Sequence, residues 1–412
     1  MRMASVLREF LGVEDTIIDG VADHRPGVVV LSVRPRDRAT RRCSICGRKS
    51  PWYDRGRGWR TWRALDCGVM QVDLRAEARR VRCRKHGVVV AAVPWARRGS
   101  GFTRHFEDTV AWLATKASQA AVQELMGVAW RTVGAIVRRV VAEQRTRAGP
   151  IVQPRRIGID EKSYRRGQRY ITLVVDHDRN RLIWAAEGRS AAVLRRFFDH
   201  LGKEACAQVQ VVSRDAAPWI KQVVDERCPA AVQCMDPFHV VAWATEAAEL
   251  ERRDQARSFR SIGMSGRAGY IKGTRWIVRT GFENLSQGQR AGLEELAAMN
   301  EPLHHAYLLK EQLRQAIRTA GESGCALVTA WIGWARASNL THMVTVADRV
   351  ADNLEEIHAA LIHRISNART EAFNTRLQMI NRRAYGFHSA QALIALAMLD
   401  LGRLCPPLPG RA

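Results

Sequence analysis

The sequence predicts an α/β protein with a mixed sheet, a long helical insertion and two small modules near its N-terminal end. Three observations lead to this fold class. Pairs of potential metal ligands enclose a basic segment early in the chain. Short apolar strands and helices then alternate over residues 151–239, as in a mixed α/β sheet. A helical pattern without strands follows over residues 240–362, and the 412 residues exceed the roughly 100–200 of one ordinary domain.

Composition excludes several classes of protein. The hydrophobic content of 46% is enough to fill cores, which rules out wholesale disorder. No apolar run reaches the roughly 18 residues that a membrane-spanning helix needs. Glu9, Glu14 and Asp15 interrupt the segment where a secretory signal would be apolar. Nine cysteines in so long a chain do not form a disulfide scaffold. We therefore expect a soluble cytoplasmic protein with no membrane partner.

The positive charge of the chain is concentrated in one segment. The whole sequence has 65 Lys and Arg against 41 Asp and Glu, a formal charge of +24. Residues 41–104 hold 17 of these basic residues and 4 of the acidic ones, a net charge of +13. Clustered arginine is typical of proteins that bind the phosphate backbone of nucleic acids. A solvated face is the alternative, but solubility does not require a cluster of one sign. We expect nucleic-acid binding.

A zinc-binding module is predicted at residues 41–97. Its ligands would be two pairs, Cys43 with Cys46 and Cys83 with His86, each with two residues between its members. A tight turn can present two such side chains to one metal, and a glycine directly follows each pair. Unrelated buried thiols are the alternative, but both pairs and both glycines are in register. Four protein ligands leave no open position, so the Zn²⁺ would be structural.

Two strands are expected around this module. Residues 1–40 form an N-terminal segment in which VVVLSV, at 28–33, is typical of a strand. Residues 70–79 alternate apolar and polar side chains, which predicts a half-buried strand between the two ligand pairs. Cys67 has no partner in the motif and is expected to pack in the interior.

Residues 103–147 predict a helix-turn-helix with its turn at Gly127. Apolar stripes at helical spacing lie on both sides of that glycine. Trp130, Arg131 and Thr132 would begin the second helix, where such motifs present residues to the major groove of DNA. An ordinary helical hairpin has the same pattern. The expectation of DNA contact therefore depends also on the neighbouring basic module.

Two aspartates follow apolar strands in the predicted core at residues 151–239. Asp160 ends the run RRIGID, and Asp215 ends the run VQVVSRD. A carboxylate at the end of a core strand is costly unless it faces a site or an ion. The 55 residues between them contain two further strands and a helix. That is enough to bring the first and fourth strands side by side in an RNase H-like sheet.

A third acid is needed for two-metal chemistry, and Glu371 is the best candidate. It lies in the C-terminal helical segment at residues 363–402, on one helical face with Asn374 and Gln378. Three carboxylates can hold two Mg²⁺ or Mn²⁺ ions, which activate an attacking water or 3′-hydroxyl and stabilise the leaving oxygen.

Other acids compete for these roles. Asp176 is typical of a turn between two strands, and Glu161 should face the opposite side of its strand from its neighbour Asp160. Asp236 ends another strand three residues before His239. This last pair could serve as accessory residues, with the histidine orienting a carboxylate or contacting the scissile phosphate, or could simply cap a helix.

The insertion at residues 240–362 contains a Gly- and Arg-rich interruption, which predicts a loop at 260–281. A tryptophan in such a basic stretch can stack on an unpaired base. The loop residues expected to contact DNA are Arg267, Lys272, Arg275 and Trp276. Trp331 and Trp334 are expected to pack between helices.

Five motifs carry a resemblance to a known family. They are GIDE at 158–161, SRDAAPWI at 213–220, DPFHVV at 236–241, LHHAYLLKEQLR at 303–314, and SNARTEAFN through RRAYGF at 366–387. In this order, together with the cysteine module, they resemble the ISL-three family of bacterial insertion-sequence transposases over about residues 40–400. The resemblance implies a DDE core with catalytic acids at Asp160, Asp215 and Glu371. His86 stands where a cysteine is commonplace, and zinc accepts either ligand.

The resemblance implies a metal-dependent transposase that binds the terminal inverted repeats of its element, cleaves their ends and joins them to target DNA. Its partner would be double-stranded DNA. It would act as a homo-oligomer in a synaptic complex, in the bacterial cytoplasm and associated with the nucleoid. One alternative is a non-catalytic DNA-binding regulator derived from such a protein, but all three acids are present. Another is a different RNase H-like endonuclease, against which the long insertion and the N-terminal modules argue.

Overall fold

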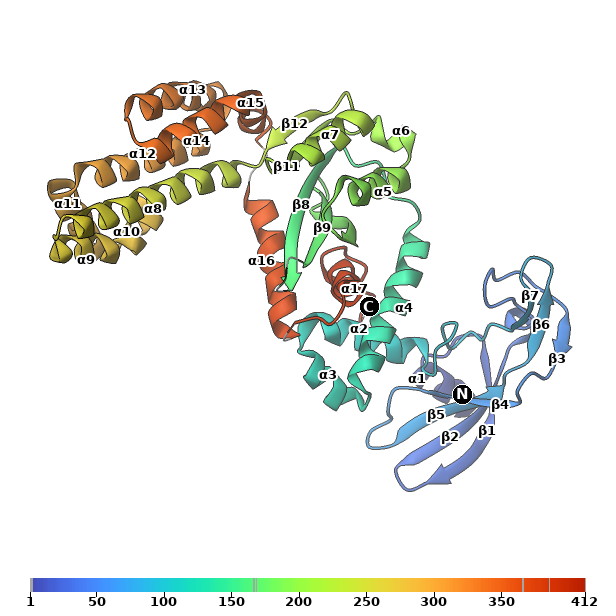
Figure 1. The fold of residues 1–412 in the computed structure, drawn as a ribbon. Coiled ribbons are helices and arrows are strands. Elements are labelled where there is room, and N and C mark those ends of the chain that lie inside the picture. Colours follow the sequence, from blue (N-terminus) through green and yellow to red (C-terminus); the bar gives the residue numbers. More distant parts are fainter. Residues whose placement is uncertain (1–2, 166, 168, 365–366, 385, 412) are drawn as a thin grey trace. The chain divides into compact units, whose positions relative to one another are not determined.

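The computed structural model describes the backbone at residues 3–165, 167, 169–364, 367–384 and 386–411 (Figure 1). Side chains are described over the same ranges except at residues 3–5, 238, 367–371 and 374. The chain forms two compact units. The first comprises residues 1–149 and 377–412, and the second comprises residues 150–376. No helix among the described residues is long and apolar enough to cross a lipid bilayer.

The first unit begins with a sheet and two short helices: α1 (Met3–Phe10), β1 (Thr16–Arg25), β2 (Val28–Pro35), η1 (Asp37–Ala39), β4 (Trp59–Arg63) and β5 (Gln71–Glu77). The strand order is β1-β2-β5-β4, with only β2 and β5 parallel among these neighbours. The predicted alternation is confirmed in β5, where Val72, Leu74 and Ala76 are buried. They pack with Trp62 and Trp95 in one apolar cluster.

A second sheet in this unit has three short strands: β3 (Trp52–Asp54), β6 (Arg80–Cys83) and β7 (Gly87–Val90). Its order is β3-β6-β7, and both pairings are antiparallel. Val81 is fully buried, but most side chains of β3 and β7 are exposed. Cys67, expected in the interior, is exposed instead. It pairs with Met70 across a tight turn that projects its side chain into solvent.

Four helices complete the first unit: α2 (Arg104–Lys116), α3 (Gln119–Met126), α4 (Trp130–Ala148) and α17 (Ala390–Asp400). The hydroxyl of Ser118 accepts a hydrogen bond from the backbone N–H of Ala121 and caps α3. Gly127 ends α3 with a φ of 58°, a left-handed conformation that glycine adopts without strain. The turn predicted at this glycine is therefore confirmed. Helix α17 packs against α2 and α4.

A buried group of charges joins the segment before α2 to the helices. The side chain of Arg97 is 5% exposed and forms ion pairs of 3.2 Å with Glu107, 2.6 Å with Asp108 and 2.6 Å with Glu143. Glu107 is fully buried and is also bound by Arg139 at 2.6 Å. Because each buried carboxylate depends on a guanidinium, this group fixes α2 and α4 against the residues that connect them to the sheets.

The second unit is built on a five-stranded sheet with three helices: β8 (Arg156–Arg165), β9 (Arg169–Asp176), β10 (Arg181–Glu187), α5 (Ala191–Leu201), α6 (Lys203–Cys206), β11 (Val211–Arg214), α7 (Pro218–Arg227) and β12 (Val232–Met235). The order is β10-β9-β8-β11-β12. Strands β10, β9 and β8 are antiparallel neighbours, whereas β8, β11 and β12 are parallel. This is the mixed RNase H-like sheet that the sequence predicts.

One face of this sheet packs on α5 and α7. Ile157 and Ile159 of β8 contact Phe197 and Phe198 of α5 in a cluster that also contains Val212. The position of Asp160 differs from the prediction. The apolar run stops at this residue, but β8 continues to Arg165 because residues 161–165 pair with β9. Asp160 therefore lies within the strand, not at its end.

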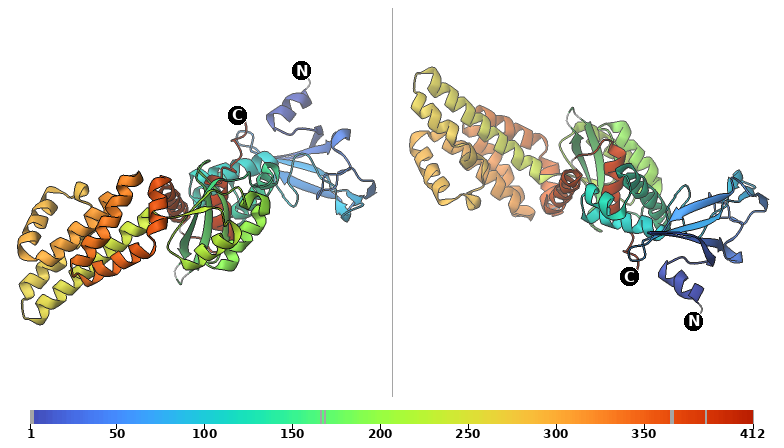
Figure 2. Two further views of the ribbon diagram at one scale, coloured as in Figure 1. Left: turned by 90° about the horizontal axis from the view of Figure 1, so that it is seen from above. Right: turned by 90° about the horizontal axis from the view of Figure 1, so that it is seen from below.

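The helical insertion is formed by α8 (Pro237–Ser261), α9 (Ser265–Gly273), α10 (Arg275–Arg279), η2 (Phe282–Asn284), α11 (Gln287–Met299), α12 (Glu301–Arg318), α13 (Gly321–Ala337), α14 (Thr341–Asp352) and α15 (Leu354–Ile362). Helix α16 (Asn367–Arg383) follows the insertion. The insertion helices run side by side in a bundle, as further views show (Figure 2). The loop expected at 260–281 is mostly helical, because Ala268, Ile271 and Val278 are buried and hold α9 and α10 in place.

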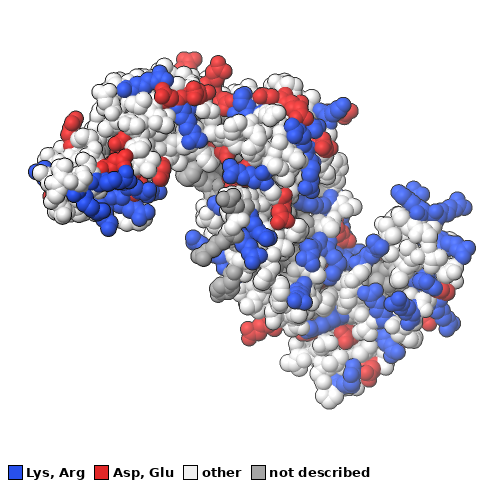
Figure 3. All heavy atoms as spheres, in the orientation of Figure 1, with Lys and Arg blue, Asp and Glu red and all other residues white. Residues whose placement is uncertain are grey.

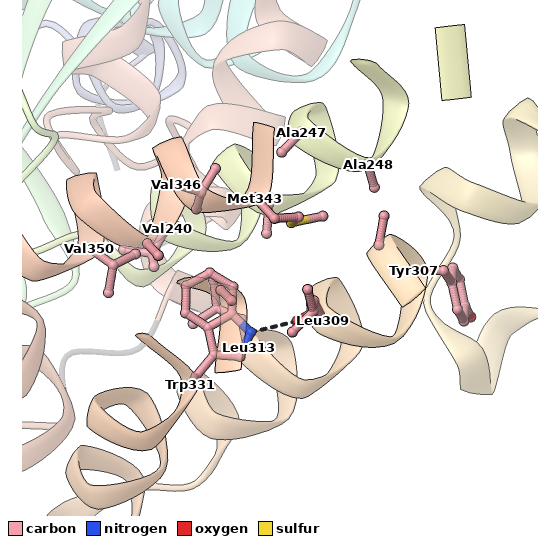
Figure 4. Packing of buried hydrophobic residues seen from close by; sticks show 14 of the residues in the cluster. Val240, Ala247, Ala248, Tyr307, Leu309, Leu313, Trp331, Met343, Val346 and Val350 are labelled. Carbon is pink, nitrogen blue, oxygen red and sulfur yellow. Dashed lines mark hydrogen bonds between the residues drawn. The ribbon is translucent and has the colours of Figure 1, made fainter. Parts of the chain in front are cut away.

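The core of the bundle is formed by α8, α12, α13 and α14 (Figure 4). Trp331 is fully buried, and its indole N–H donates a hydrogen bond of 2.8 Å to the carbonyl of Leu309. Val240, Met343 and Val350 pack in the same cluster. Trp334, expected to pack as well, is 49% exposed, because it lies beside the buried stripe of α13 that Val328, Trp331, Ile332 and Ala335 form.

Arg97→Ala should destabilise the first unit by about 3–5 kcal/mol, because it leaves the buried carboxylate of Glu107 and its neighbours without their main cation. Hydrogen exchange of α2 and α4 as a function of urea measures this loss. Arg98→Ala removes an exposed arginine next to it and is the control. Equal protection in the two variants would show that the buried charges do not hold the helices together.

Candidate functional site

The four predicted zinc ligands lie close together in the first unit. The Nδ1 atom of His86 lies 3.6 Å from the Sγ atoms of both Cys43 and Cys83, and the Sγ atoms of Cys46 and Cys83 are 3.7 Å apart. Tetrahedral zinc with its usual bond lengths requires ligand atoms roughly 3.6–3.8 Å apart. Among the described residues, this is the one set of three or more potential ligands whose atoms all lie within 4.8 Å. The arrangement fits a structural zinc ion.

The local backbone presents these side chains. Gly47 and Gly87 follow the two pairs with φ values of 70° and 68°, which lets each turn close behind its ligands. Backbone N–H groups of Lys85 and His86 point at the sulfur of Cys83 and lower the pKa of that thiol to about 6. A metal binds the thiolate form of cysteine, so these turns prepare the sulfur for coordination.

The second site is formed where β8 and β11 lie side by side. Val212 pairs with Ile157, and Ser213 pairs with Gly158, in parallel register. Asp160 lies two residues beyond Gly158, and Asp215 lies two residues beyond Ser213. The pairing ends at Ser213 and Gly158, and Asp215 directly follows the last residue of β11, so the register brings both aspartates near the same end of the paired segment. Both residues are partly exposed.

Glu161 shares the electrostatic environment of these aspartates, which the sequence did not indicate. Its side chain is 6% exposed and forms an ion pair of 2.5 Å with Arg189. Burial raises the pKa of Glu161 to about 7. The charge of Asp215 also raises this pKa, Arg189 lowers it, and Asp160 raises it. By alternation, the side chain of Glu161 lies on the opposite face of β8 from that of Asp160. It is still near enough to both aspartates for their charges to raise its pKa.

The other candidate acids have distinct surroundings. Asp236 directly follows β12, and its carboxylate lies 3.9 Å from Nε2 of His239 in the first turn of α8. The buried carboxylate of Asp176 accepts hydrogen bonds from the backbone N–H groups of Asp178 and Arg179. Asp176 is therefore a turn residue, as predicted. The backbone of Glu371 belongs to α16, but its side chain lies outside the described residues.

A cavity of about 280 Å³ adjoins Asp215. Its wall contains the residues Arg189, Asp215, Ala216, Ala217, His239, Trp243 and Arg349. The wall thus combines a carboxylate with two guanidinium groups and an imidazole. Arg189 and Arg349 were not recognised in the sequence, because they lie far from any motif and only the fold brings them to Asp215.

The residues predicted to read DNA begin α4. Trp130 is 46% exposed and Arg131 is exposed, with its guanidinium 5.6 Å from the centre of the Trp130 ring. Thr132 is half-buried. The ring of Trp130 also lies 5.5 Å from that of His388 in the same unit. These side chains present an aromatic and cationic surface at the start of the second helix of the helix-turn-helix.

The predicted DNA-contacting residues of the insertion lie on α9 and α10. Arg267, Lys272, Arg275 and Trp276 are all exposed, and Trp276 is 64% exposed. Lys and Arg side chains gather on this end of the bundle (Figure 3). The buried Lys310 donates hydrogen bonds of 2.9 Å to the carbonyls of Val278 and Thr280 and so fixes the end of α10.

A third basic surface lies in the zinc module, where the sequence predicted a cluster of basic residues but not their pairing with aromatic rings. Arginines lie over the rings of exposed aromatic residues, with Arg75 at 4.9 Å from Trp59, Arg79 at 5.4 Å from Trp52, and Arg82 at 4.9 Å from Tyr53. Trp52 and Trp59 line an open groove of about 1380 Å³. The sequence signal was present, since aromatic and arginine residues alternate in PWYDRGRGWRTW between the ligand pairs.

Comparison with known proteins assigns these parts to one family. Residues 39–86 match the zinc-finger of transposases IS204, IS1001, IS1096 and IS1165, and residues 91–141 match the helix-turn-helix domain of transposase family ISL3. Residues 157–397, more than half of the chain, match the DDE transposase domain of the same family. The chain belongs to the ISL3 (ISL-three) family of transposases.

Individual members of the ISL3 family are similar over most of their length. The transposase for insertion sequence element IS1557, found in two strains of Mycobacterium tuberculosis, is 48% identical over 100% of this chain and 98% of that protein. The transposase for insertion sequence element IS1001 of Bordetella parapertussis is 27% identical over 78% of this chain and 79% of that protein. The resemblance inferred from the sequence motifs is confirmed.

Cys43→Ser should reduce the zinc content of the purified protein from one ion per chain to near zero, because metal binding and folding are coupled in such modules. Hydrogen exchange should rise in β3, β6 and β7, which bury few apolar side chains, while β2 and β5 keep the protection of their own cluster. Elemental analysis and hydrogen exchange test both points. Cys67→Ser, at an exposed cysteine of the same module, is the control. Wild-type protein without zinc would refute this assignment.

Proposed function

We propose that this transposase binds the terminal inverted repeats of its insertion sequence and cleaves and transfers DNA strands at a divalent-metal site held by Asp160, Asp215 and Glu371. The observation that carries the proposal is the parallel pairing of β8 and β11, which supports a common site for the partly exposed residues Asp160 and Asp215. Carboxylate oxygens are the ligands that Mg²⁺ and Mn²⁺ prefer. The family supports a third acid, and Glu371 matches it by its motif.

Ions held by these carboxylates would activate the attacking water or 3′-hydroxyl and stabilise the leaving oxygen. The protein backbone fixes the positions of the two aspartates. Asp215 is fixed by a hydrogen bond of 2.9 Å from the backbone N–H of Ala217, and Asp160 by one of 2.7 Å from the backbone N–H of Glu161. Asp236 and His239 act as accessory residues, with His239 reaching the cavity beside Asp215. Glu161 is not a ligand in this scheme, because Arg189 already neutralises it.

DNA recognition is assigned to the basic surfaces of both units. The zinc module carries most of the net charge of +13 over residues 41–104, which attracts the phosphate backbone without regard to sequence. Trp130, Arg131 and Thr132 would enter the major groove at the start of α4. The end of the insertion would contact DNA through its exposed residues Arg267, Lys272, Arg275 and Trp276. Two element ends must be handled together, so a homo-oligomer in a synaptic complex is expected.

Asp160→Asn, Asp215→Asn and Glu371→Gln should each abolish strand cleavage and strand transfer, while binding to the element ends stays within about threefold of wild type, because each change removes a charge and keeps the shape of the side chain. The assay incubates full-length protein with its own element ends and Mg²⁺ and follows cleavage on sequencing gels and binding by gel shift. Residues acting as a unit should be non-additive, so the triple variant should be no worse than a single one.

Asp199→Asn is the matched control, since this carboxylate lies on α5 and is 59% exposed. It should retain cleavage. Wild-type protein that binds the ends but never cleaves them would favour the non-catalytic regulator. Cleavage of branched or unrelated DNA without preference for the ends would favour the endonuclease. Substantial cleavage by any of the three variants would overturn the assignment of that residue.

A further inference from the structure

The cavity beside Asp215 is formed by segments that are far apart in the sequence. Asp215 follows β11, Arg189 lies between β10 and α5, and His239 and Trp243 lie in the first turns of α8. Arg349 comes from α14, in the second half of the insertion. The insertion therefore contributes a cation to the wall of a cavity that also contains one of the proposed catalytic carboxylates.

Arg349 is held in place by an aromatic ring. Its guanidinium lies 3.7 Å from the centre of the Trp243 ring, closer than any other arginine–ring contact among the described residues. Within the described part of the chain, no Asp or Glu forms an ion pair with it, whereas Arg189 is bound to Glu161 and Arg336 to Asp348. Burial lowers the pKa of Arg349, and the charge of Asp215 opposes that effect. Stacking on an indole leaves the N–H groups at the edge of the guanidinium available for an acceptor.

The charges around the cavity favour an anion. Asp215 is the acid whose charge acts on Arg349. If Asp215 holds a metal ion, as the proposed function requires, its charge is no longer available to Arg349. A second anion is then needed beside the guanidinium. Arginine binds phosphate oxygens well because its planar donors match their geometry, and the imidazole of His239 lies in the same wall.

We propose that Arg349, stacked on Trp243, binds a phosphodiester group of the DNA strand that is cut beside Asp215. The inference rests on the proposed function and adds a ligand subsite to it. It gives the helical insertion a direct part in the active site, because α14 supplies the arginine while α8 supplies the ring that orients it. Arg349 is a substrate-binding residue in this account, and Trp243 is a positioning residue.

The test measures coupling between the arginine and single phosphates of the DNA. Duplexes of the element end carry one neutral methylphosphonate at the cleaved phosphate or at one of its neighbours, and full-length protein is bound to them with Ca²⁺ in place of Mg²⁺. Wild type should lose affinity by on the order of tenfold or more at one position, because a charge-assisted hydrogen bond is lost there. Arg349→Gln should bind the unmodified duplex more weakly than wild type by the same factor. A methylphosphonate at that position should not weaken its binding further, because both changes remove the same interaction.

Arg336→Gln is the matched control, because it removes an arginine of the insertion that lies near Arg349 in sequence order but is paired with Asp348. It should respond to each methylphosphonate as wild type does. Arg349→Lys keeps the charge and should restore part of the lost affinity, which also separates lost contact from misfolding. Additive losses at every position, or wild-type affinity in Arg349→Gln, would overturn the proposal.

The outcome is distinguishable from failure of the proposed function. Binding with Ca²⁺ is measured without cleavage, so coupling at one phosphate can be found or refuted even if Asp160→Asn retains activity. Conversely, loss of cleavage in Asp160→Asn together with additive losses in Arg349→Gln would leave the carboxylate site standing and would remove the phosphate subsite.

Discussion

The parallel pairing of β8 with β11 is the constraint on which the second unit depends. The two strands are far apart in the sequence, and the chain between them forms β9, β10, α5 and α6. Gly158 makes the approach possible, because a Cβ at this position would lie 2.7 Å from Nε2 of His177 and 2.8 Å from a methyl carbon of Val175. His177 in turn forms a buried hydrogen bond of 2.7 Å with Ser213 of β11. This hydrogen bond supports the register in which Ser213 pairs with Gly158.

The first unit relies on polar and metal interactions where apolar burial is small. Its four-stranded sheet has a compact apolar cluster, whereas the three-stranded sheet beside the cysteines buries few apolar side chains. A small domain of this kind needs a metal or another cross-link to fold stably. The ion pairs of Arg97 have a similar role for the helices, because they fix the direction of α2 and α4 through buried charges.

The sequence predicted those features that depend on short spacing. The zinc ligands, the turn at Gly127 and the half-buried strand β5 are local patterns, and the structure shows each where it was expected. The spacing of Asp160 and Asp215 also predicted that the first and fourth strands of the core, β8 and β11, lie side by side. Residue type and spacing were sufficient there because neighbouring residues determine turns, caps and alternation.

Features that depend on distant contacts could not be predicted. The apolar run before Asp160 ends in mid-strand, since pairing with β9 and not hydrophobicity extends β8. Glu161 meets its ion-pair partner Arg189, from the β10–α5 connection, only in the folded chain. Arg349 reaches the cavity of Asp215 through the packing of α14 on α8, which no motif records.

The most direct measurement of the central claim is a Mn²⁺ titration of the full-length protein with its zinc site filled, followed by the electron paramagnetic resonance signal of free Mn²⁺. Metal binding should be saturable, and Asp160→Asn and Asp215→Asn should each weaken it by about tenfold or more, because both carboxylates contribute to one site. The exposed control Asp199→Asn should bind Mn²⁺ as wild type does. Equal Mn²⁺ affinity in wild type and in both active-site variants would contradict the account, since aligned strands would then bring two aspartates together without forming a metal site.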